Sequence, residues 1–312
     1  MAEAAPLYST DAAPVPTGGA AEWFAGAGGA RLRAALFPAG GPPRGSVVVS
    51  PGRTEPIEKY FEVARRLAGR GFVVLVHDWR GHGLSLRQAG DTRGHASGWR
   101  DFIADYAALI AAYEARLPRP WIALGHSMGG CLTLLALAQG EGRFSAAILS
   151  APMLGLQTGT IPRPAARILA ALMTAVGRGA DLASRAPLAP DTFESNILTH
   201  DRARYERNLE QVVVHPDLMV GPPTWGWLDF AFSAIAELEH GAGPARIAIP
   251  LTVAAAGEER LVDNAGLRRV TARVPGARFV TIQGAYHEIL QEADPIQDRF
   301  WAEFDALAAR LT

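Results

Sequence analysis

The chain has 312 residues, of which 49% are hydrophobic and 20% are charged, a composition typical of folded globular proteins and not of disordered ones. The net charge of −1 argues against a nucleic-acid-binding protein, because the chain has no basic excess to meet phosphate groups. Cys131 is the single cysteine, which excludes an intramolecular disulfide and a metal site built from cysteines.

Neither the N-terminal segment nor the longest apolar stretch of the chain has the features of a secretory signal or a membrane span. Residues 1–20 are rich in Ala, Pro, Thr and Gly and lack the basic and apolar regions of a secretory signal, so we expect a flexible N-terminal arm there. The apolar stretch of residues 165–176 is interrupted by Arg167 and is shorter than the ~18 residues of a membrane span. The expected location is the cytoplasm.

Short apolar runs alternate with helical patterns along the first half of the chain. Continuous apolar runs of this kind are typical of strands buried on both faces of a parallel sheet. The expected order is a hairpin of residues 22–25 and 31–37, strand 46–50, helix 57–68, strand 72–77, helix 101–117, a strand from 121, helix 131–138 and strand 144–150. This alternation predicts an α/β protein with a mostly parallel, doubly wound sheet and right-handed crossovers.

Residues 156–245 break the alternation, since they contain helical stretches, prolines and aromatic residues but no convincing buried strand. We interpret this segment as a helical lid inserted into a core made of residues 21–155 and 246–312. Most of its aromatic side chains are expected to pack the lid onto the core. The alternation then resumes with strand 249–256, helix 264–273, strand 277–282 and helix 289–311.

The sequence Gly125-His-Ser-Met-Gly129 joins an apolar strand to an apolar helix, the pattern of a nucleophile elbow. Gly125 and Gly129 allow the helix to pass close to the strand, because a Cβ at either position would meet neighbouring backbone. The turn holds Ser127 in a strained conformation above the sheet edge, at the N-terminus of the following helix. We therefore predict that Ser127 is a nucleophile.

A serine nucleophile needs a histidine base and a carboxylate that orients the base, and in this fold both follow the serine in the chain. Of the eight histidines, only His287 comes directly after the last predicted strand. The loop after strand 249–256 offers Glu259, which we prefer because it lies three residues into the loop, and Asp263 as the alternative acid. Asp263 is also well placed to cap the next helix.

The oxyanion hole is expected to use the N–H of Met128, directly after the nucleophile, and the N–H of Arg53 in the loop after strand 46–50. Because the backbone would serve the oxyanion, the Arg53 side chain is free for another role. A contact with a phosphate and an ion pair with Glu55 are both open at this point.

These motifs together resemble the lysophospholipase and monoacylglycerol lipase branch of the α/β-hydrolases, a serine aminopeptidase S33-like family, over about residues 20–310. The resemblance rests on Pro51-Gly-Arg-Thr-Glu55, Lys59-Tyr60, Asp78-Trp-Arg-Gly-His-Gly-Leu-Ser85, Gly125-His-Ser-Met-Gly-Gly130, Ser150-Ala-Pro-Met153, Glu259-Arg-Leu-Val-Asp263 and Gly284-Ala-Tyr-His287. Monoacylglycerol lipases usually carry His-Gly in place of Pro51-Gly52 and Asp in place of Glu259, so the chain is more similar to bacterial lysophospholipases.

The resemblance implies hydrolysis of a carboxylic ester of a single-chain lipid, a lysophospholipid or a monoacylglycerol, through an acyl-enzyme on Ser127. It implies no cofactor and no metal, and it leaves open a peripheral contact of the lid with the inner membrane. Two other functions are compatible with the same fold. A carboxylesterase or aminopeptidase-like enzyme would use the same triad on a small substrate, and a non-catalytic binding protein would use none of it. The oligomeric state is unknown from the sequence.

Overall fold

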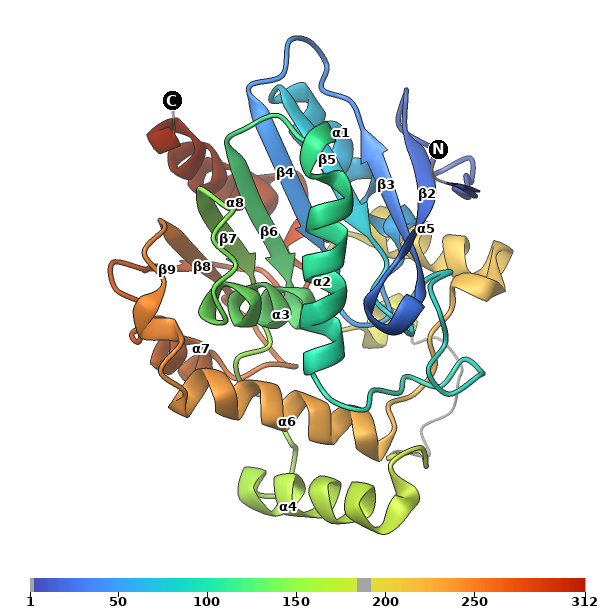
Figure 1. Ribbon diagram of the computed structural model, residues 1–312, viewed down its shortest axis with the longest axis vertical. Helices are drawn as coiled ribbons and strands as arrows, with labels where there is room; N and C mark the ends of the chain where they lie inside the picture. The colour runs from blue at the N-terminus through green and yellow to red at the C-terminus, as the bar shows by residue number, and fades with distance from the viewer. Residues whose placement is uncertain (1–2, 184–191, 312) are drawn as a thin grey trace.

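In the computed structural model, which describes residues 3–183 and 192–311, nine strands form one sheet in the order β1-β2-β3-β5-β4-β6-β7-β8-β9 (Figure 1). The strands are β1 (Ala4–Ala5), β2 (Ala20–Ala25), β3 (Arg31–Phe37), β4 (Gly45–Ser50), β5 (Phe72–His77), β6 (Trp121–His126), β7 (Ala146–Ser150), β8 (Leu251–Ala256) and β9 (Arg278–Ile282). The first three strands and the β3–β5 pair are antiparallel, and every pair from β5 to β9 is parallel. The predicted hairpin and the mostly parallel, doubly wound sheet are confirmed.

Helices cover both faces of this sheet, which explains why its central strands are mostly apolar and buried along their whole length. Every residue of β4, β6 and β8 is buried. One face packs against α2 (Arg100–Tyr113), α3 (Ser127–Ala138), α6 (Trp225–His240) and α7 (Asn264–Thr271), and the other packs against α1 (Phe61–Gly69) and α8 (Asp294–Ala308). Because both faces are closed, the polar groups at the strand ends gather at the edge of the sheet.

The segment between β7 and β8 is helical, and its helices differ in how deeply they are buried. It contains α4 (Arg163–Met173), α5 (Arg202–Val214) and α6, with short helical turns at 174–178, 193–195, 216–218 and 244–246. The sequence placed α6 in the lid, but its Phe230, Ala231 and Ala234 are fully buried and share a hydrophobic cluster with α3. Helix α6 is therefore part of the core, while α4 lies at the outer end of the molecule (Figure 1). Residues 184–191 of the predicted lid lie outside the described residues.

The N-terminal segment also differs from the flexible arm that the sequence predicted. Strand β1 pairs with β2, and Ala13 is buried. The hydroxyl of Tyr8 donates to Asp217 over 2.8 Å, and the ring of Tyr8 stacks on His215 at 4.2 Å. The amino-acid composition of residues 1–20 predicted a flexible arm because composition carries no information on contacts with residues about 200 positions away in the chain. Residues 1–2 lie outside the described part.

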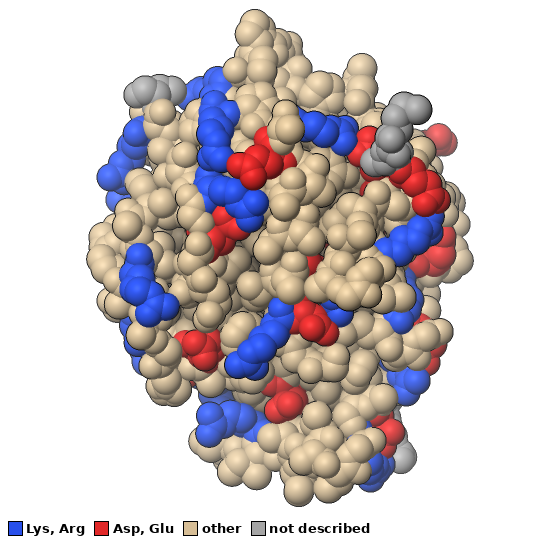
Figure 2. Space-filling view, viewed as in Figure 1, with Lys and Arg blue, Asp and Glu red and all other residues tan. Residues whose placement is uncertain are grey.

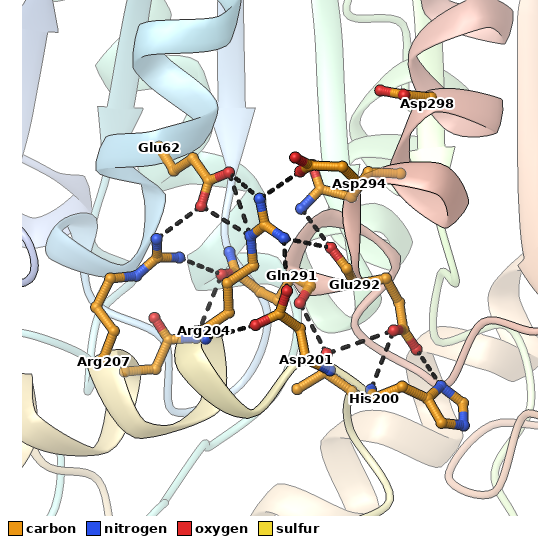
Figure 3. A network of polar contacts seen from close by, with 12 residues as sticks. Glu62, His200, Asp201, Arg204, Arg207, Gln291, Glu292, Asp294 and Asp298 are labelled. Atoms are coloured by element: carbon orange, nitrogen blue, oxygen red, sulfur yellow. Dashed lines mark hydrogen bonds and ion pairs between the residues drawn. The ribbon is translucent and has the colours of Figure 1, made fainter.

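A network of ion pairs joins α5 to α1 and to the start of α8 (Figure 3). The carboxylate of Glu62 accepts hydrogen bonds from Arg204 and Arg207, each with a shortest distance of 2.6 Å. Arg204 also pairs with Asp294 at 2.6 Å, and Glu292 accepts from His200 at 2.9 Å. The network fixes α5, and the chain that leads into it, against the core.

Candidate active site

Ser127 lies at the sharp turn between β6 and α3, with a left-handed φ of 50° that side chains rarely adopt. A Cβ on Gly125 would lie 2.7 Å from the Cα of Gly130, and a Cβ on Gly129 would lie 2.1 Å from the carbonyl oxygen of Ser50. Only glycine fits at these two positions without moving backbone. The packing therefore holds Ser127 in the strained conformation that the elbow motif predicted.

The three residues predicted as nucleophile, base and acid come together at the carboxyl edge of the sheet. His287 Nε2 lies 2.9 Å from the hydroxyl oxygen of Ser127, and His287 Nδ1 lies 2.8 Å from Oε2 of Glu259. The side chains of His287 and Glu259 are 5% and 2% exposed, so solvent hardly competes for the bond between them. With a proton on Nδ1, His287 presents the lone pair of Nε2 to the hydroxyl of Ser127.

The carboxylate of Glu259 is held from two sides. Its Oε1 accepts the backbone N–H groups of Arg260, Leu261 and Val262 at 2.9, 2.8 and 3.2 Å, which leaves Oε2 for His287. Burial alone would raise the pKa of Glu259, but the hydrogen bond and charge of His287, together with N–H donors of the loop, outweigh burial and lower it. Glu259 is therefore ionised at neutral pH.

Asp263, the alternative acid, has a different role in the structure. Its carboxylate caps α7 by accepting the N–H groups of Ala265 and Gly266, each at 3.0 Å, and pairs with Arg163 at 2.8 Å. Helix capping was the second interpretation of this residue in the sequence. The carboxylate that contacts His287 is that of Glu259.

The two residues predicted for the oxyanion hole line the same cavity as Ser127. Met128 lies in the first turn of α3, where N–H groups have no acceptor within the helix and the helix dipole favours negative charge. Arg53 follows β4 in a loop in which Thr54 has a left-handed φ of 67°. The indole of Trp79 donates to the carbonyl of Pro51 over 2.8 Å and ties this loop to the loop that follows β5.

A buried group of charged residues beneath the loop was not predicted from the sequence. The ammonium of Lys59 lies 2.8 Å from Glu55 and 2.6 Å from Glu288, the residue after His287. Glu55 also accepts a hydrogen bond from the hydroxyl of Tyr60 at 2.6 Å. Since Lys59 is the only lysine of the chain, its presence beside Tyr60 was a signal, but the sequence could not show which acids it meets.

His126 lies next to the catalytic candidates, with its ring 5.0 Å from that of His287. Its Nδ1 is 3.0 Å from the carbonyl oxygen of Ser150. Burial lowers the pKa of His126 to about 4, so the ring is neutral at pH 7 and adds no positive charge beside His287.

Ser127 and His287 open into a cavity of about 560 Å³. Most of its wall is apolar and comes from the segment between β7 and β8. The apolar lining residues include Met153, Leu156, Ile161, Ala166, Leu169, Leu198, Trp225, Trp227, Leu228, Phe232, Leu261 and Val262. An apolar cavity of this size beside the serine can hold an extended hydrocarbon chain. In residues 3–183 and 192–311, no three His, Cys, Asp or Glu side chains are grouped so as to hold a metal ion.

The sheet order, the strained serine at the elbow and the chain of Ser127, His287 and Glu259 define an α/β-hydrolase. The sequence profile of the serine aminopeptidase S33 family matches residues 41–294. Because this match spans most of the chain, the protein belongs to that family. The resemblance drawn from the motifs is confirmed.

Named relatives agree with this assignment. The chain is 37% identical over 266 residues to lysophospholipase L2 of Escherichia coli (strain K12), covering 80% of this chain and 76% of that protein. It is 29% identical over 283 residues to the monoacylglycerol lipase of Mycolicibacterium smegmatis, covering 87% and 91%. A soluble variant of monoglyceride lipase from Saccharomyces cerevisiae has the same fold, with a TM-score of 0.72, 18% identity, and coverage of 94% and 96%.

Proposed function

We propose that this protein is a serine hydrolase that cleaves the carboxylic ester of a single-chain lipid, a lysophospholipid or a monoacylglycerol. The observation that carries the proposal is the chain of hydrogen bonds from Glu259 through His287 to Ser127, which ends at a largely apolar cavity of about 560 Å³. The names of the relatives, lysophospholipase and monoacylglycerol lipase, support the same class of substrate.

In the proposed mechanism the hydroxyl oxygen of Ser127 attacks the ester carbonyl carbon while its proton passes to Nε2 of His287. Glu259 holds the resulting imidazolium in place. The N–H groups of Arg53 and Met128 donate to the oxyanion of the tetrahedral intermediate. The intermediate collapses as the bond to the alcohol oxygen breaks, and His287 gives its proton to that oxygen.

The acyl-enzyme is then hydrolysed by the same groups. His287 removes a proton from a water molecule, whose oxygen attacks the acyl carbon. Collapse of the second tetrahedral intermediate releases the fatty acid and returns the proton to Ser127. The protein's own residues account for every proton transfer of this cycle.

A substrate panel tests the class of ester. We expect fatty-acid release from 1-palmitoyl lysophosphatidylglycerol or 1-palmitoylglycerol with kcat/KM at least about tenfold above that for a butyrate ester, because each buried methylene contributes about 0.8 kcal/mol. A preference for short acyl chains would favour the carboxylesterase alternative. Cleavage of an N-terminal amino acid amide, with no ester hydrolysis, would favour the peptidase alternative.

We also infer that residues 156–183 and 192–224, between β7 and α6, form a cap over the cavity and that α4 contacts a membrane surface. Ile168, Leu172 and Val176 recur every four residues on one side of α4 and the turn after it, and they are 64%, 55% and 60% exposed. In Figure 2 the lowest tip of the molecule, at the end where α4 lies, shows no charged side chain, although charged side chains of both signs flank it. Such a helix can lie in the interface of a bilayer from which a lipid substrate would enter.

No helix among the described residues is long and apolar enough to cross a membrane.

A further inference from the structure

The side chain of Arg53 is held in a fixed position at the wall of the active-site cavity. Its Nη2 donates to the carbonyl oxygen of Gly221, and the guanidinium lies 5.1 Å from the ring centre of Trp227. Gly94 packs directly against it, because a Cβ on Gly94 would lie 2.5 Å from Nη2 of Arg53. These contacts come from two separate segments of the chain, around residue 94 and residues 221–227, so the guanidinium is oriented before any ligand arrives.

This guanidinium has no carboxylate partner in the part of the chain that the structure describes. The sequence left open an ion pair with Glu55, but Glu55 is occupied by Lys59 and by the hydroxyl of Tyr60. The buried Nε of Arg53 has no hydrogen-bond partner. Burial without an opposing charge lowers the pKa of Arg53 to about 10, which leaves it charged at neutral pH.

Arg53 also lies where two cavities adjoin. A second cavity of about 590 Å³ lies between the loop after β4, helix α5 and residues 216–222, and Arg53 lines both cavities. The first cavity contains Ser127 and is mainly apolar. The second is also lined mostly by apolar residues, but its wall includes the polar residues Lys59, Asn208 and Gln211. A substrate whose acyl chain fills the first cavity can place its head group past Arg53 in the second.

The acids beside this junction do not cancel the charge of Arg53. Lys59 lies between Glu55 and Glu288 and binds both. Burial raises the pKa of Glu288, so this carboxyl takes up a proton more readily than an exposed glutamate. Arg53 is therefore the cation at the junction that is not already bound to a carboxylate among the described residues.

We propose that the Arg53 side chain binds the phosphate of a lysophospholipid head group and so makes the enzyme prefer lysophospholipids over monoacylglycerols. The inference rests on the proposed lipid-ester hydrolase function. A guanidinium presents paired N–H donors that match two phosphate oxygens, and such charge-assisted bonds are stronger than neutral ones. A monoacylglycerol offers only a hydroxyl at the same place, so it gains much less from the unpaired charge.

The experiment compares two substrates that share one acyl chain, 1-palmitoyl lysophosphatidylglycerol and 1-palmitoylglycerol, in the same mixed micelles. The readout is the ratio of their kcat/KM values. If a substitution at Arg53 also disturbs its backbone N–H in the oxyanion hole, both kcat/KM values change by the same factor, and that factor cancels from the ratio. We expect Arg53→Gln to lower this ratio about 10- to 100-fold, the effect of losing hydrogen bonds to a charged group. Arg53→Lys keeps the charge but not the paired donors, and it should fall between wild type and Arg53→Gln.

Two further variants separate a specific role from a general one. Gly94→Ala leaves Arg53 in the sequence but displaces its guanidinium, and it should lower the ratio in the same direction. Arg87 is a matched control, since its guanidinium also donates to backbone carbonyls, those of Gly81, Gly83 and Asp217, and lines neither cavity. Arg87→Gln should leave the ratio within about twofold of wild type, because no phosphate contact is lost.

The outcomes distinguish this inference from the proposed function. An equal loss on both lipids in Arg53→Gln, or an unchanged ratio, would overturn the phosphate contact and leave the lipid hydrolase intact. Wild-type protein that prefers 1-palmitoylglycerol would also overturn it. Wild-type protein that cleaves small esters but neither lipid would refute the proposed function, and the inference with it.

Discussion

Replacing Glu259 by Gln removes one negative charge and leaves the shape of the site almost unchanged. The oxygen that faces Arg260, Leu261 and Val262 accepts three backbone N–H groups, so the amide oxygen of Gln must take that place. The amide nitrogen then faces Nδ1 of His287, where the carboxylate oxygen now lies at 2.8 Å. Because an amide NH₂ donates, Nδ1 must become the acceptor and the proton of His287 moves to Nε2.

In that tautomer His287 donates to Ser127 and cannot accept its proton. Loss of the correct tautomer in a serine triad lowers kcat roughly 10⁴-fold, which corresponds to about 5 kcal/mol of transition-state stabilisation. We expect Glu259→Gln to lower kcat by roughly 10³- to 10⁴-fold while KM changes little, because the acyl cavity is untouched.

The assay is fatty-acid release from a monoacylglycerol or lysophospholipid, with Asp263→Asn as the matched control. Asp263 caps α7 and lies outside the hydrogen-bond chain. Asn caps a helix about as well as Asp, so the variant should lose mainly the ion pair with Arg163, at most about 1 kcal/mol of stability, and keep kcat within a few-fold. Thermal unfolding confirms that both variants are folded. A large loss of kcat in Asp263→Asn alone would refute the assignment of Glu259.

Three further changes test the packing, the cap and the membrane contact. Gly129→Ala should abolish activity and lower the melting temperature because its Cβ would meet the Ser50 carbonyl at 2.1 Å, whereas Gly142→Ala, with its nearest neighbour at 3.9 Å, should be tolerated in both assays. Burial alone would raise the pKa of Glu62, but Arg204 and Arg207 lower it to about 2. The ionised carboxylate therefore contributes its full stabilisation above about pH 4.3, the pKa of an unperturbed Glu, and this contribution is lost as the pH falls toward 2. Glu62→Gln should therefore lose roughly 1–3 kcal/mol in urea unfolding at pH 7, with a smaller difference from wild type at pH 3.5, and a difference independent of pH would contradict the argument. Leu172→Glu should weaken sedimentation with anionic lipid vesicles about tenfold, and unchanged sedimentation would remove α4 from the membrane contact.

The succession of strands and helices along the chain and the candidate catalytic residues could be predicted because local patterns carry them. The glycines around Ser127 and the positions of Glu259 and His287 after late strands each follow from a short stretch of sequence. Composition and periodicity do not report contacts between distant residues. Tyr8 meets Asp217, and Lys59 meets Glu288 across 229 positions, so neither the ordered N-terminal segment nor the buried charges beneath the site could be derived.

The position of helix α6 also depends on packing that a local sequence pattern does not report. Its apolar residues predicted burial, but burial against the core and burial within a lid have the same sequence pattern. Only the packing of Phe230 and Ala234 on the cluster of α3 places it in the core.

The most direct test of the catalytic claim is labelling with a fluorophosphonate, followed by identification of the modified peptide, on wild-type protein and on Ser127→Ala. The account predicts one modified peptide that contains Ser127 in the wild type, and neither labelling nor fatty-acid release above background in the variant. Labelling at another serine, or fatty-acid release by the folded Ser127→Ala variant at the wild-type rate, would contradict it.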